Sequence, residues 1–218
     1  MKHLLVKVCG MRQADNIRQV EQLRPDWMGF ICWNGSKRFV EHAPAYLPLS
    51  CRRIGVFVNP SLDEIRRYTD LLGLTSVQLH GHESPDFCRK AGRLCGADGR
   101  PLPIIKAFGV ESGCPLPDTA PWEEACRYFL FDTRCEGAGG SGRTFGWHVL
   151  EQYRGSRPFL LSGGIGPEQF GALQRFDHPM WAGIDLNSRF ETEPGLKDVS
   201  RLQHFIEQIR KQENQTQP

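Results

Sequence analysis

The fold is decided by the stretch Phe159-Leu160-Leu161-Ser162-Gly163-Gly164-Ile165-Gly166, in which a short apolar run ends in a glycine-rich turn. Seven similar runs lie outward from it, mostly upstream, and each is followed by a helix-like stretch or a Gly/Pro-rich loop. Repeated βα units of this kind indicate a parallel sheet. The eight predicted strands are Leu4–Cys9, Trp27–Cys32, Arg53–Val58, Ser76–Leu79, Ile104–Ala107, Tyr128–Phe131, Phe159–Leu161 and Ala182–Leu186.

The segments between these strands complete one α/β domain. Helical spacing appears in Ala14–Leu23, Leu62–Leu72, Asp86–Leu94, Gly146–Tyr153, Pro167–Phe176 and Asp198–Lys211. The helical spacing is weak in the crossovers that follow the second and the fifth strand. Three prolines and two glycines in Gly109–Pro121 predict that the fifth crossover is irregular. We therefore expect residues 1–211 to form a single (β/α)8 TIM barrel, followed by a polar, frayed tail at residues 212–218.

Charge and composition argue against several classes of protein. The 218 residues contain 27 Lys and Arg against 25 Asp and Glu, a net charge of +2, with no long block of like charge, so no nucleic-acid partner is indicated. The amino terminus turns polar before any signal-peptide core develops, and no apolar run is long enough for a membrane span, which predicts a cytoplasmic protein. Eight cysteines form no close C-x-x-C pair and are interpreted as mostly free thiols. The oligomeric state stays open, with a monomer as the simpler expectation.

Two loops predict a phosphate site at the carboxyl ends of the last two strands. Gly163 and Gly164 follow the seventh strand, and Asn187, Ser188 and Arg189 follow the eighth. Barrels of this class bind phosphate there, because glycines let backbone N–H groups approach an anion. The alternatives are that the glycines only form a tight turn and that Arg189 is only a solvated cation.

Cys9 ends the first predicted strand, and Lys7, two residues earlier, lies on the same strand face. A nearby ammonium raises the thiolate fraction of a cysteine, as a cysteine general base requires. The alternative is that Cys9 is a small buried hydrophobic residue.

Asp132 follows the apolar run Tyr128–Phe131, which delivers one carboxyl group to the mouth of the barrel. We expect a dry neighbourhood there, where desolvation raises the pKa of a carboxyl group and suits it to act as a general acid. The alternative is an aspartate that caps a helix or organises a loop.

The loop Arg134–Phe145 is long and dense in glycine for a βα connection. Such a loop is able to close over a ligand, although a passive linker explains its composition nearly as well.

Further polar residues at strand ends are candidates for substrate binding. Arg38, after the second strand, is suited to hold a carboxylate bidentately, with Lys37 as the competing candidate. Lys7, His80 and Asp185 are also expected near the substrate, although isolated residues of this kind are more often part of the scaffold. The sequence has no metal-ligand spacing, P-loop or dinucleotide fingerprint, so the simplest expectation is a reaction without metal or cofactor.

Taken together, the chain from Lys7 to Lys211 resembles the phosphoribosylanthranilate isomerase family of the tryptophan pathway. The segments that support the resemblance are Lys7-Val8-Cys9-Gly10-Met11, Ser36-Lys37-Arg38-Phe39-Val40, Gly55-Val56-Phe57-Val58-Asn59, Val77-Gln78-Leu79-His80-Gly81, Ile105-Lys106-Ala107-Phe108, Gly139-Gly140-Ser141-Gly142-Arg143-Thr144-Phe145, Ser162-Gly163-Gly164-Ile165 and Gly183-Ile184-Asp185-Leu186-Asn187-Ser188.

This resemblance implies roles for particular residues. The family's general base is a cysteine at the end of strand one and its general acid is an aspartate at the end of strand six, which match Cys9 and Asp132. It also places the substrate carboxylate near Arg38 and the phosphate over the strand seven and eight loops. The implied reaction is the Amadori rearrangement of N-(5-phosphoribosyl)anthranilate to 1-(2-carboxyphenylamino)-1-deoxyribulose 5-phosphate, the third step of tryptophan biosynthesis from chorismate.

The chain departs from the family pattern in two places. Arg189-Phe190 stands where a small residue or glycine is expected, and Trp33-Asn34-Gly35 replaces a proline-containing segment. Both changes bear on substrate affinity more than on reaction type. Two rival interpretations are a histidine-pathway isomerase, a barrel that uses two aspartates, and a catalytically silent barrel that binds a phosphorylated ligand or a partner protein.

Overall fold

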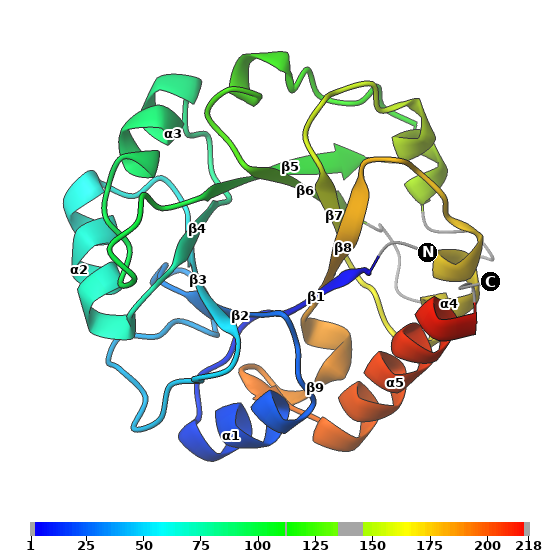
Figure 1. The fold of residues 1–218 in the computed structure, drawn as a ribbon, viewed down its shortest axis with the longest axis horizontal. Coiled ribbons are helices and arrows are strands. Elements are labelled where there is room, and N and C mark those ends of the chain that lie inside the picture. Colours follow the sequence, from blue (N-terminus) through cyan, green and yellow to red (C-terminus); the bar gives the residue numbers. More distant parts are fainter. Residues whose placement is uncertain (1–2, 112, 135–145, 216–218) are drawn as a thin grey trace.

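A computed structural model describes residues 3–111, 113–134 and 146–215. Its centre is a closed barrel of eight parallel strands in sequence order, with helices around the outside (Figure 1). The predicted (β/α)8 barrel is therefore confirmed. The strands are β1 (Leu5–Val8), β2 (Trp27–Ile31), β3 (Arg52–Phe57), β4 (Ser76–Leu79), β5 (Ile104–Glu111), β6 (Tyr128–Arg134), β7 (Phe159–Ser162) and β8 (Trp181–Leu186).

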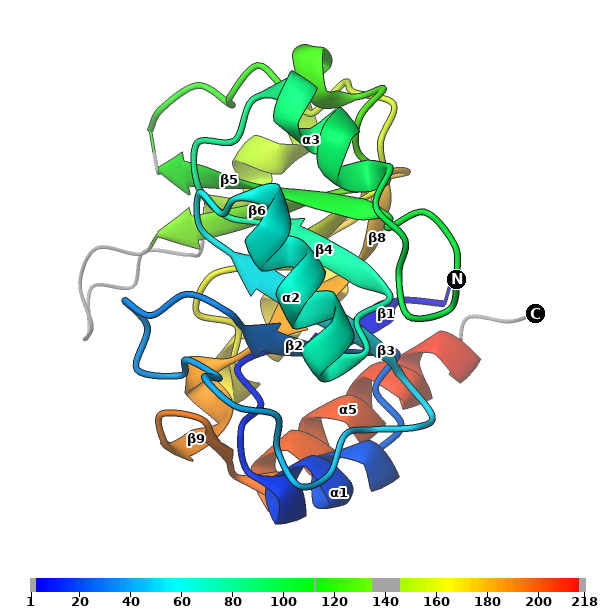
Figure 2. The same ribbon diagram turned by 90° about the vertical axis from the view of Figure 1, so that its left-hand side faces the viewer.

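Strands β5 and β6 extend further than the sequence predicted. They pair with each other from Ile105 opposite Tyr128 to Glu111 opposite Arg134, and their arrowheads point to the same end of the barrel (Figure 2). Gly109 discouraged a strand prediction at this point, but the backbone hydrogen bonds between two neighbours outweigh the weak propensity of one glycine.

The α-helices are α1 (Ala14–Gln22), α2 (Leu62–Leu72), α3 (Pro85–Gly92), α4 (Phe170–Arg175) and α5 (Val199–Gln215). Helix α2 has the bounds predicted from the sequence, and local signals explain why. Ser61 and Glu64 form a capping box at its start, and Gly73 ends it in the left-handed conformation, with φ of 59°. Ile65 and Leu72 lie on its buried face.

The weak crossovers are irregular, as predicted. Among the described residues, the β2–β3 connection contains no helix, and the β5–β6 connection contains only the 3-10 turn η1 (Ala120–Trp122). Two predicted helices are shorter or tighter than expected, because η2 (Gly146–Gln152) is a 3-10 helix and α4 is preceded by η3 (Pro167–Gln169). Helix α5 continues to Gln215, past the predicted start of the tail, since Gln and Glu are good helix formers.

A small hairpin after β8 was not expected from the sequence. The 3-10 turn η4 (Ser188–Phe190) leads into β9 (Glu191–Glu193) and β10 (Leu196–Lys197), which pair in an antiparallel way. These strands are too short to show an alternating pattern of apolar and polar residues.

The interior of the barrel changes character along the strands. Its amino-terminal half is apolar and consists of Trp27, Ile54, Ile105, Ala107, Leu130 and Leu160. Because every second residue points inward, the next inward positions are two residues further along each strand. On β6 and β7 these positions are Asp132 and Ser162. The strands thus bring polar groups to the carboxyl end of an otherwise apolar barrel.

Candidate active site

A cavity of about 190 Å³ lies at the carboxyl ends of the barrel strands. Both predicted catalytic side chains, Cys9 and Asp132, line it. Its wall consists of Cys9, Ile31, Val56, Gln78, His80, Asp132, Ser162, Gly163, Gly164, Ile165, Asp185, Asn187 and Ser188. Three predicted site residues, Lys7, Arg38 and Arg189, are not part of that wall.

Cys9 lies directly after β1, where the chain leaves the barrel. Its backbone N–H donates to the carbonyl oxygen of Leu186 at 2.9 Å, which extends the pairing of β1 with β8 by one residue. Its side chain is buried with Ile31 and Val56 and is 4% exposed. The thiol is therefore held by apolar neighbours and reaches the cavity over a small area.

Gly29 makes room for this thiol and was missed by the sequence analysis. A Cβ atom at position 29 would lie 2.8 Å from Sγ of Cys9 and 3.2 Å from Nζ of Lys7. Any side chain there would displace both groups. The available signal was a glycine inside an apolar strand, which often marks a close approach.

Lys7 lies inside the barrel beneath Cys9. Its side chain is completely buried, and Nζ donates to Oδ1 of Asp185 at 2.9 Å, from the neighbouring strand β8. Ser162 Oγ lies 3.4 Å from the other carboxylate oxygen of Asp185. Asp185 lines the cavity, but it also forms an ion pair with Lys7, so its role is in the first place structural.

The expected activation of Cys9 by Lys7 is only part of the electrostatics. Burial raises the pKa of the Cys9 thiol above its ordinary value, although the Lys7 and Lys197 ammonium groups act to lower it. Lys7 thus acts in the expected direction, but burial outweighs it and the pKa of the thiol is raised overall. Burial also acts to lower the pKa of Lys7, but Asp185 and Cys9 outweigh burial and the pKa is raised.

Asp132 faces His80 across the cavity mouth. The distance from Oδ2 to His80 Nε2 is 3.3 Å, and the two side chains are 30% and 34% exposed. The expectation of a dry neighbourhood is therefore wrong, because this end of β6 is open to solvent. Gln78 Nε2 lies 3.2 Å from His80 Nδ1. The two ring nitrogens of His80 are thus in contact with Gln78 on one side and Asp132 on the other.

The predicted phosphate loops meet at the same cavity. Gly163 and Gly164 have φ angles of 90° and 64°, a conformation that favours glycine, and both line the cavity. Among the described residues, their two backbone N–H groups have no hydrogen-bond acceptor. Ile165 and, across from them, Asn187 and Ser188 complete this part of the wall.

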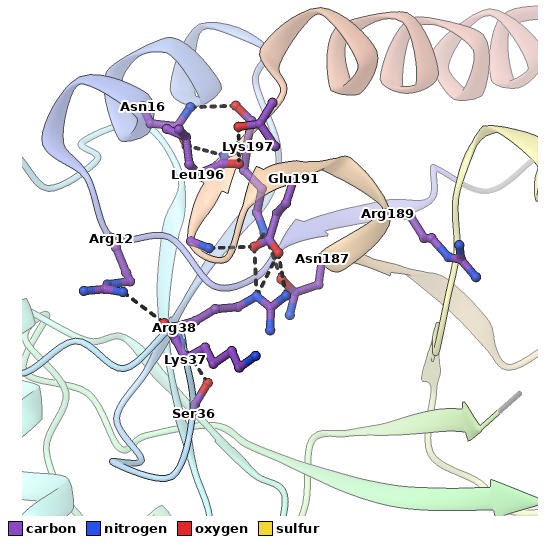
Figure 3. A network of polar contacts seen from close by, with 12 residues as sticks. Arg12, Asn16, Ser36, Lys37, Arg38, Asn187, Arg189, Glu191, Leu196 and Lys197 are labelled. Carbon is purple, nitrogen blue, oxygen red and sulfur yellow. Dashed lines mark hydrogen bonds and ion pairs between the residues drawn. The ribbon is translucent and has the colours of Figure 1, made fainter. Parts of the chain in front are cut away.

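Arg189 departs from the predicted cluster. Its side chain is exposed and points away from Asn187 and Arg38 (Figure 3). The phosphate loops therefore present backbone groups and short side chains to the cavity, with Arg189 outside it.

Arg38 is close to the cavity but separated from it by one residue. A Cβ atom at Gly10, the residue after Cys9, would lie 2.7 Å from Cδ of Arg38 and 2.8 Å from Oδ1 of Asn187. The Arg38 guanidinium is held by Glu191, a residue that the sequence analysis did not single out (Figure 3). Lys37, the competing candidate, is exposed, and its carbonyl oxygen accepts from Arg12 at 2.9 Å.

The remaining expectations concern the glycine-rich loop, the cysteines, metal binding and membrane spans. Most of the predicted Arg134–Phe145 loop, residues 135–145, lies outside the described residues, as does Cys135. The seven described cysteines are free thiols, as expected. In the described part of the chain, no three His, Cys, Asp or Glu side chains are grouped to hold a metal ion. No helix within the same ranges is long and apolar enough to cross a membrane.

The sequence from residue 6 to residue 208 matches the model of the N-(5'-phosphoribosyl)anthranilate isomerase family. The chain belongs to this family. A family member from Phocaeicola vulgatus is 49% identical over 207 residues, which cover 95% of this chain and 98% of that protein. The expected resemblance is thus confirmed over nearly the whole length.

Solved structures of the family have the same fold. The phosphoribosyl anthranilate isomerase of Thermotoga maritima superposes with a TM-score of 0.75 at 30% identity, covering 96% of this chain and 100% of that one. Another member of the family was crystallised with reduced 1-(o-carboxyphenylamino)-1-deoxyribulose 5-phosphate. It superposes with a TM-score of 0.71 at 27% identity, covering 96% of this chain and 100% of that one.

Proposed function

We propose that this chain rearranges N-(5-phosphoribosyl)anthranilate to 1-(2-carboxyphenylamino)-1-deoxyribulose 5-phosphate, with Asp132 as general acid and Cys9 as general base. The main support is that one cavity contains the thiol, the carboxyl group and the pair of glycine N–H groups. A sugar phosphate anchored at the glycine turn would have its ring between Cys9 and Asp132. Family membership supports the same reaction.

In the first step Asp132 donates a proton to the ring oxygen of the ribose. The bond between C1 and that oxygen breaks, and the nitrogen lone pair forms a C1–N double bond, which gives an open-chain iminium ion. Asp132 is on the solvent-exposed side of the cavity, where water can return its proton after each cycle. His80, whose Nε2 lies 3.3 Å from Oδ2 of Asp132, orients the carboxyl group toward the cavity.

In the second step the Cys9 thiolate removes the proton from C2. The C–H electron pair forms a C1–C2 double bond, and the iminium electrons return to nitrogen, which gives an enolamine. The enol at C2 then becomes a ketone as C1 gains a proton. Every step exchanges a proton with the substrate or shifts a bonding pair within it, and the substrate is rearranged without net oxidation or reduction, so the reaction requires no cofactor.

The two ends of the substrate fit the groups beside these residues. The phosphate would accept hydrogen bonds from Gly163 and Gly164, with Asn187 and Ser188 on the other side. The anthranilate carboxylate would approach Arg38, whose guanidinium lies just behind Gly10. Binding both ends fixes the ribose between the acid and the base, which is the main requirement for this chemistry.

The decisive experiment follows the fluorescence of freshly prepared N-(5-phosphoribosyl)anthranilate during incubation with purified protein. We expect turnover by the wild type, and a loss of kcat of roughly 10² to 10⁴ in Cys9→Ala and in Asp132→Asn, because each removes one proton-transfer group. Cys51→Ala and Asp63→Asn, which change the same residue types outside the cavity wall, are the matched controls and should keep wild-type rates.

Folded wild-type protein without turnover would contradict the proposed function. Near-wild-type rates in either cavity variant would contradict the role assigned to that residue. Circular dichroism of every variant distinguishes a lost catalytic group from a lost fold.

A further inference from the structure

The hairpin β9–β10 places Glu191 and Lys197 opposite each other beside the cavity. Both side chains are almost completely buried, and Nζ of Lys197 donates to Oε1 of Glu191 at 2.6 Å. A buried ion pair adds little net stability, since both charges lose their water. Stability alone therefore does not explain the pair of Glu191 and Lys197.

The Glu191 carboxylate is surrounded by N–H donors, most of them from Arg38. Nε of Arg38 lies 2.9 Å from both carboxylate oxygens, and Nη2 lies 2.5 Å from Oε2. The backbone N–H of Gly195 donates to Oε1 at 3.1 Å. Burial acts to raise the pKa of Glu191, but Arg38 and Lys197 outweigh burial, so this pKa lies below its ordinary value and the group stays ionised.

Lys197 connects this pair to the phosphate loop. Its Nζ also donates to Oδ1 of Asn187 at 2.8 Å, and Asn187 lines the cavity (Figure 3). Asn16, on α1, fixes the backbone of Lys197 with two hydrogen bonds of 2.9 and 2.8 Å. The backbone of Lys197 is therefore fixed by helix α1, while its ammonium group binds Glu191 and Asn187.

The way Glu191 binds Arg38 leaves one edge of the guanidinium uncommitted. Glu191 occupies the edge formed by Nε and Nη2. Among the described residues, Nη1 of Arg38 has no hydrogen-bond partner, and an outer hydrogen of Nη2 is also unused. The edge formed by Nη1 and Nη2 presents two parallel N–H bonds, the geometry that binds a carboxylate bidentately.

The charges of the cluster also suit an anion. Arg38 paired with Glu191 alone would be neutral and would attract a carboxylate weakly. Lys197 leaves the three residues with one net positive charge, while Glu191 restricts the rotation of Arg38. The cluster thus combines an orientation fixed by Glu191 with a positive field to which Lys197 contributes, and neither of these two residues provides both.

We propose that Glu191 and Lys197 are positioning residues, which hold Arg38 so that its Nη1–Nη2 edge receives the substrate carboxylate. This inference rests on the proposed function. Neither residue touches the reacting atoms, so their effect should appear in binding of the carboxylated end of the ligand.

The test compares two ligands that differ only in the carboxyl group. The first is reduced 1-(o-carboxyphenylamino)-1-deoxyribulose 5-phosphate, and the second is the same compound made from aniline, without the carboxyl group. Calorimetry gives the Kd of both ligands for wild type, Arg38→Ala, Glu191→Gln and Lys197→Met. Glu193→Gln removes an exposed carboxylate from the same hairpin and is the matched control.

We expect Glu191→Gln to weaken the carboxylated ligand about 10- to 100-fold, as the loss of an oriented charged hydrogen bond does. The ligand without a carboxyl group should bind within about threefold of wild type. Lys197→Met should weaken both ligands, because it also releases Asn187, and should weaken the carboxylated ligand more than the other. Glu193→Gln should change neither Kd. In the Arg38→Ala background, Glu191→Gln should have no further selective effect, because there is then no guanidinium to position.

Equal weakening of both ligands by Glu191→Gln and by Lys197→Met would overturn the inference, since it indicates a purely structural role. Unchanged binding of the carboxylated ligand would overturn it as well. The proposed function is tested separately by wild type and Arg38→Ala. If the wild type turns over N-(5-phosphoribosyl)anthranilate and binds both ligands, and Arg38→Ala loses affinity only for the carboxylated one, the function stands whatever the hairpin variants show.

Discussion

The two halves of the barrel interior both contain completely buried side chains but are chemically different. The amino-terminal half is a layer of apolar side chains that includes Ile54, Leu130 and Leu160, none of them exposed. The carboxyl-terminal half contains Lys7, completely buried, and Asp185, 7% exposed. The burial of a side chain therefore does not show whether it serves the fold or the reaction. The residues that it contacts must be known as well.

The partners explain how the polar half is tolerated. The Lys7 ammonium is paired with Asp185, and Ser162 lies beside the same carboxylate. Burial of the apolar side chains stabilises the fold, because it removes apolar surface from water. Burial of the polar side chains costs hydration free energy, and the pairing between them offsets that cost. The difference suggests that the apolar half maintains the fold and the polar half maintains the chemistry.

The largest expected effect comes from breaking the buried pair of the polar half. Lys7→Met leaves the Asp185 carboxylate buried without its cation, which should lower the free energy of unfolding by about 3–5 kcal/mol. Activity should also fall, because the ammonium next to Cys9 is lost. Urea denaturation measures the stability, and the anthranilate fluorescence assay measures the activity.

A second substitution serves as the control for this result. In Lys7→Met combined with Asp185→Asn, the uncompensated charge is absent, so part of the stability should return while activity stays low. A loss in Lys7→Met well below 1 kcal/mol would show that the pair is not the main interaction of this layer.

A smaller effect, confined to stability, is expected in the apolar half. Leu160→Ala removes a fully buried side chain and should cost roughly 2–5 kcal/mol of unfolding free energy, depending on how far the cavity collapses. Its kcat at 25 °C should stay within about twofold of wild type, since the cavity wall begins two residues later, at Ser162. A large decrease in kcat of the folded variant would contradict the separation between the two halves.

Much of this architecture was predictable from local sequence. The strands of a parallel barrel are short apolar runs, and helix α2 has strong start and stop signals at Ser61 and Gly73. The extra length of β5 and β6 was not predictable, because it depends on pairing between the two strands around Gly109. The hairpin β9–β10 was also missed, since two or three residues are too few to show a period.

The site was predictable to the extent that its residues end strands. Cys9, Asp132, Gly163 and Gly164 all do so, and the closure of the barrel brings them together. Glu191 was not predictable, because it meets Arg38 only through contacts between residues that are 153 positions apart. The pKa of Cys9 was also out of reach, since the balance of burial and charge depends on neighbours from other strands.

The smallest effect concerns the pH dependence of the reaction. Burial raises the pKa of the Cys9 thiol above its ordinary value of 9.0, and the thiolate is the active form. In Asp132→Asn, which has no carboxyl proton to titrate in the opposite direction, the residual kcat/KM should therefore rise with pH, by at most about tenfold per unit, and should not level off below pH 9 if proton removal by Cys9 limits the rate.

Stability should change in the opposite direction. A group whose pKa is higher in the folded state than in the unfolded state stabilises the fold at low pH and loses that contribution as pH rises. The free energy of unfolding should fall above pH 9 in wild type and fall less in Cys9→Ala, as measured by urea denaturation at several pH values. A plateau of kcat/KM near pH 7 in Asp132→Asn, with no such difference in stability, would indicate that Lys7 and Lys197 lower the thiol pKa more than burial raises it.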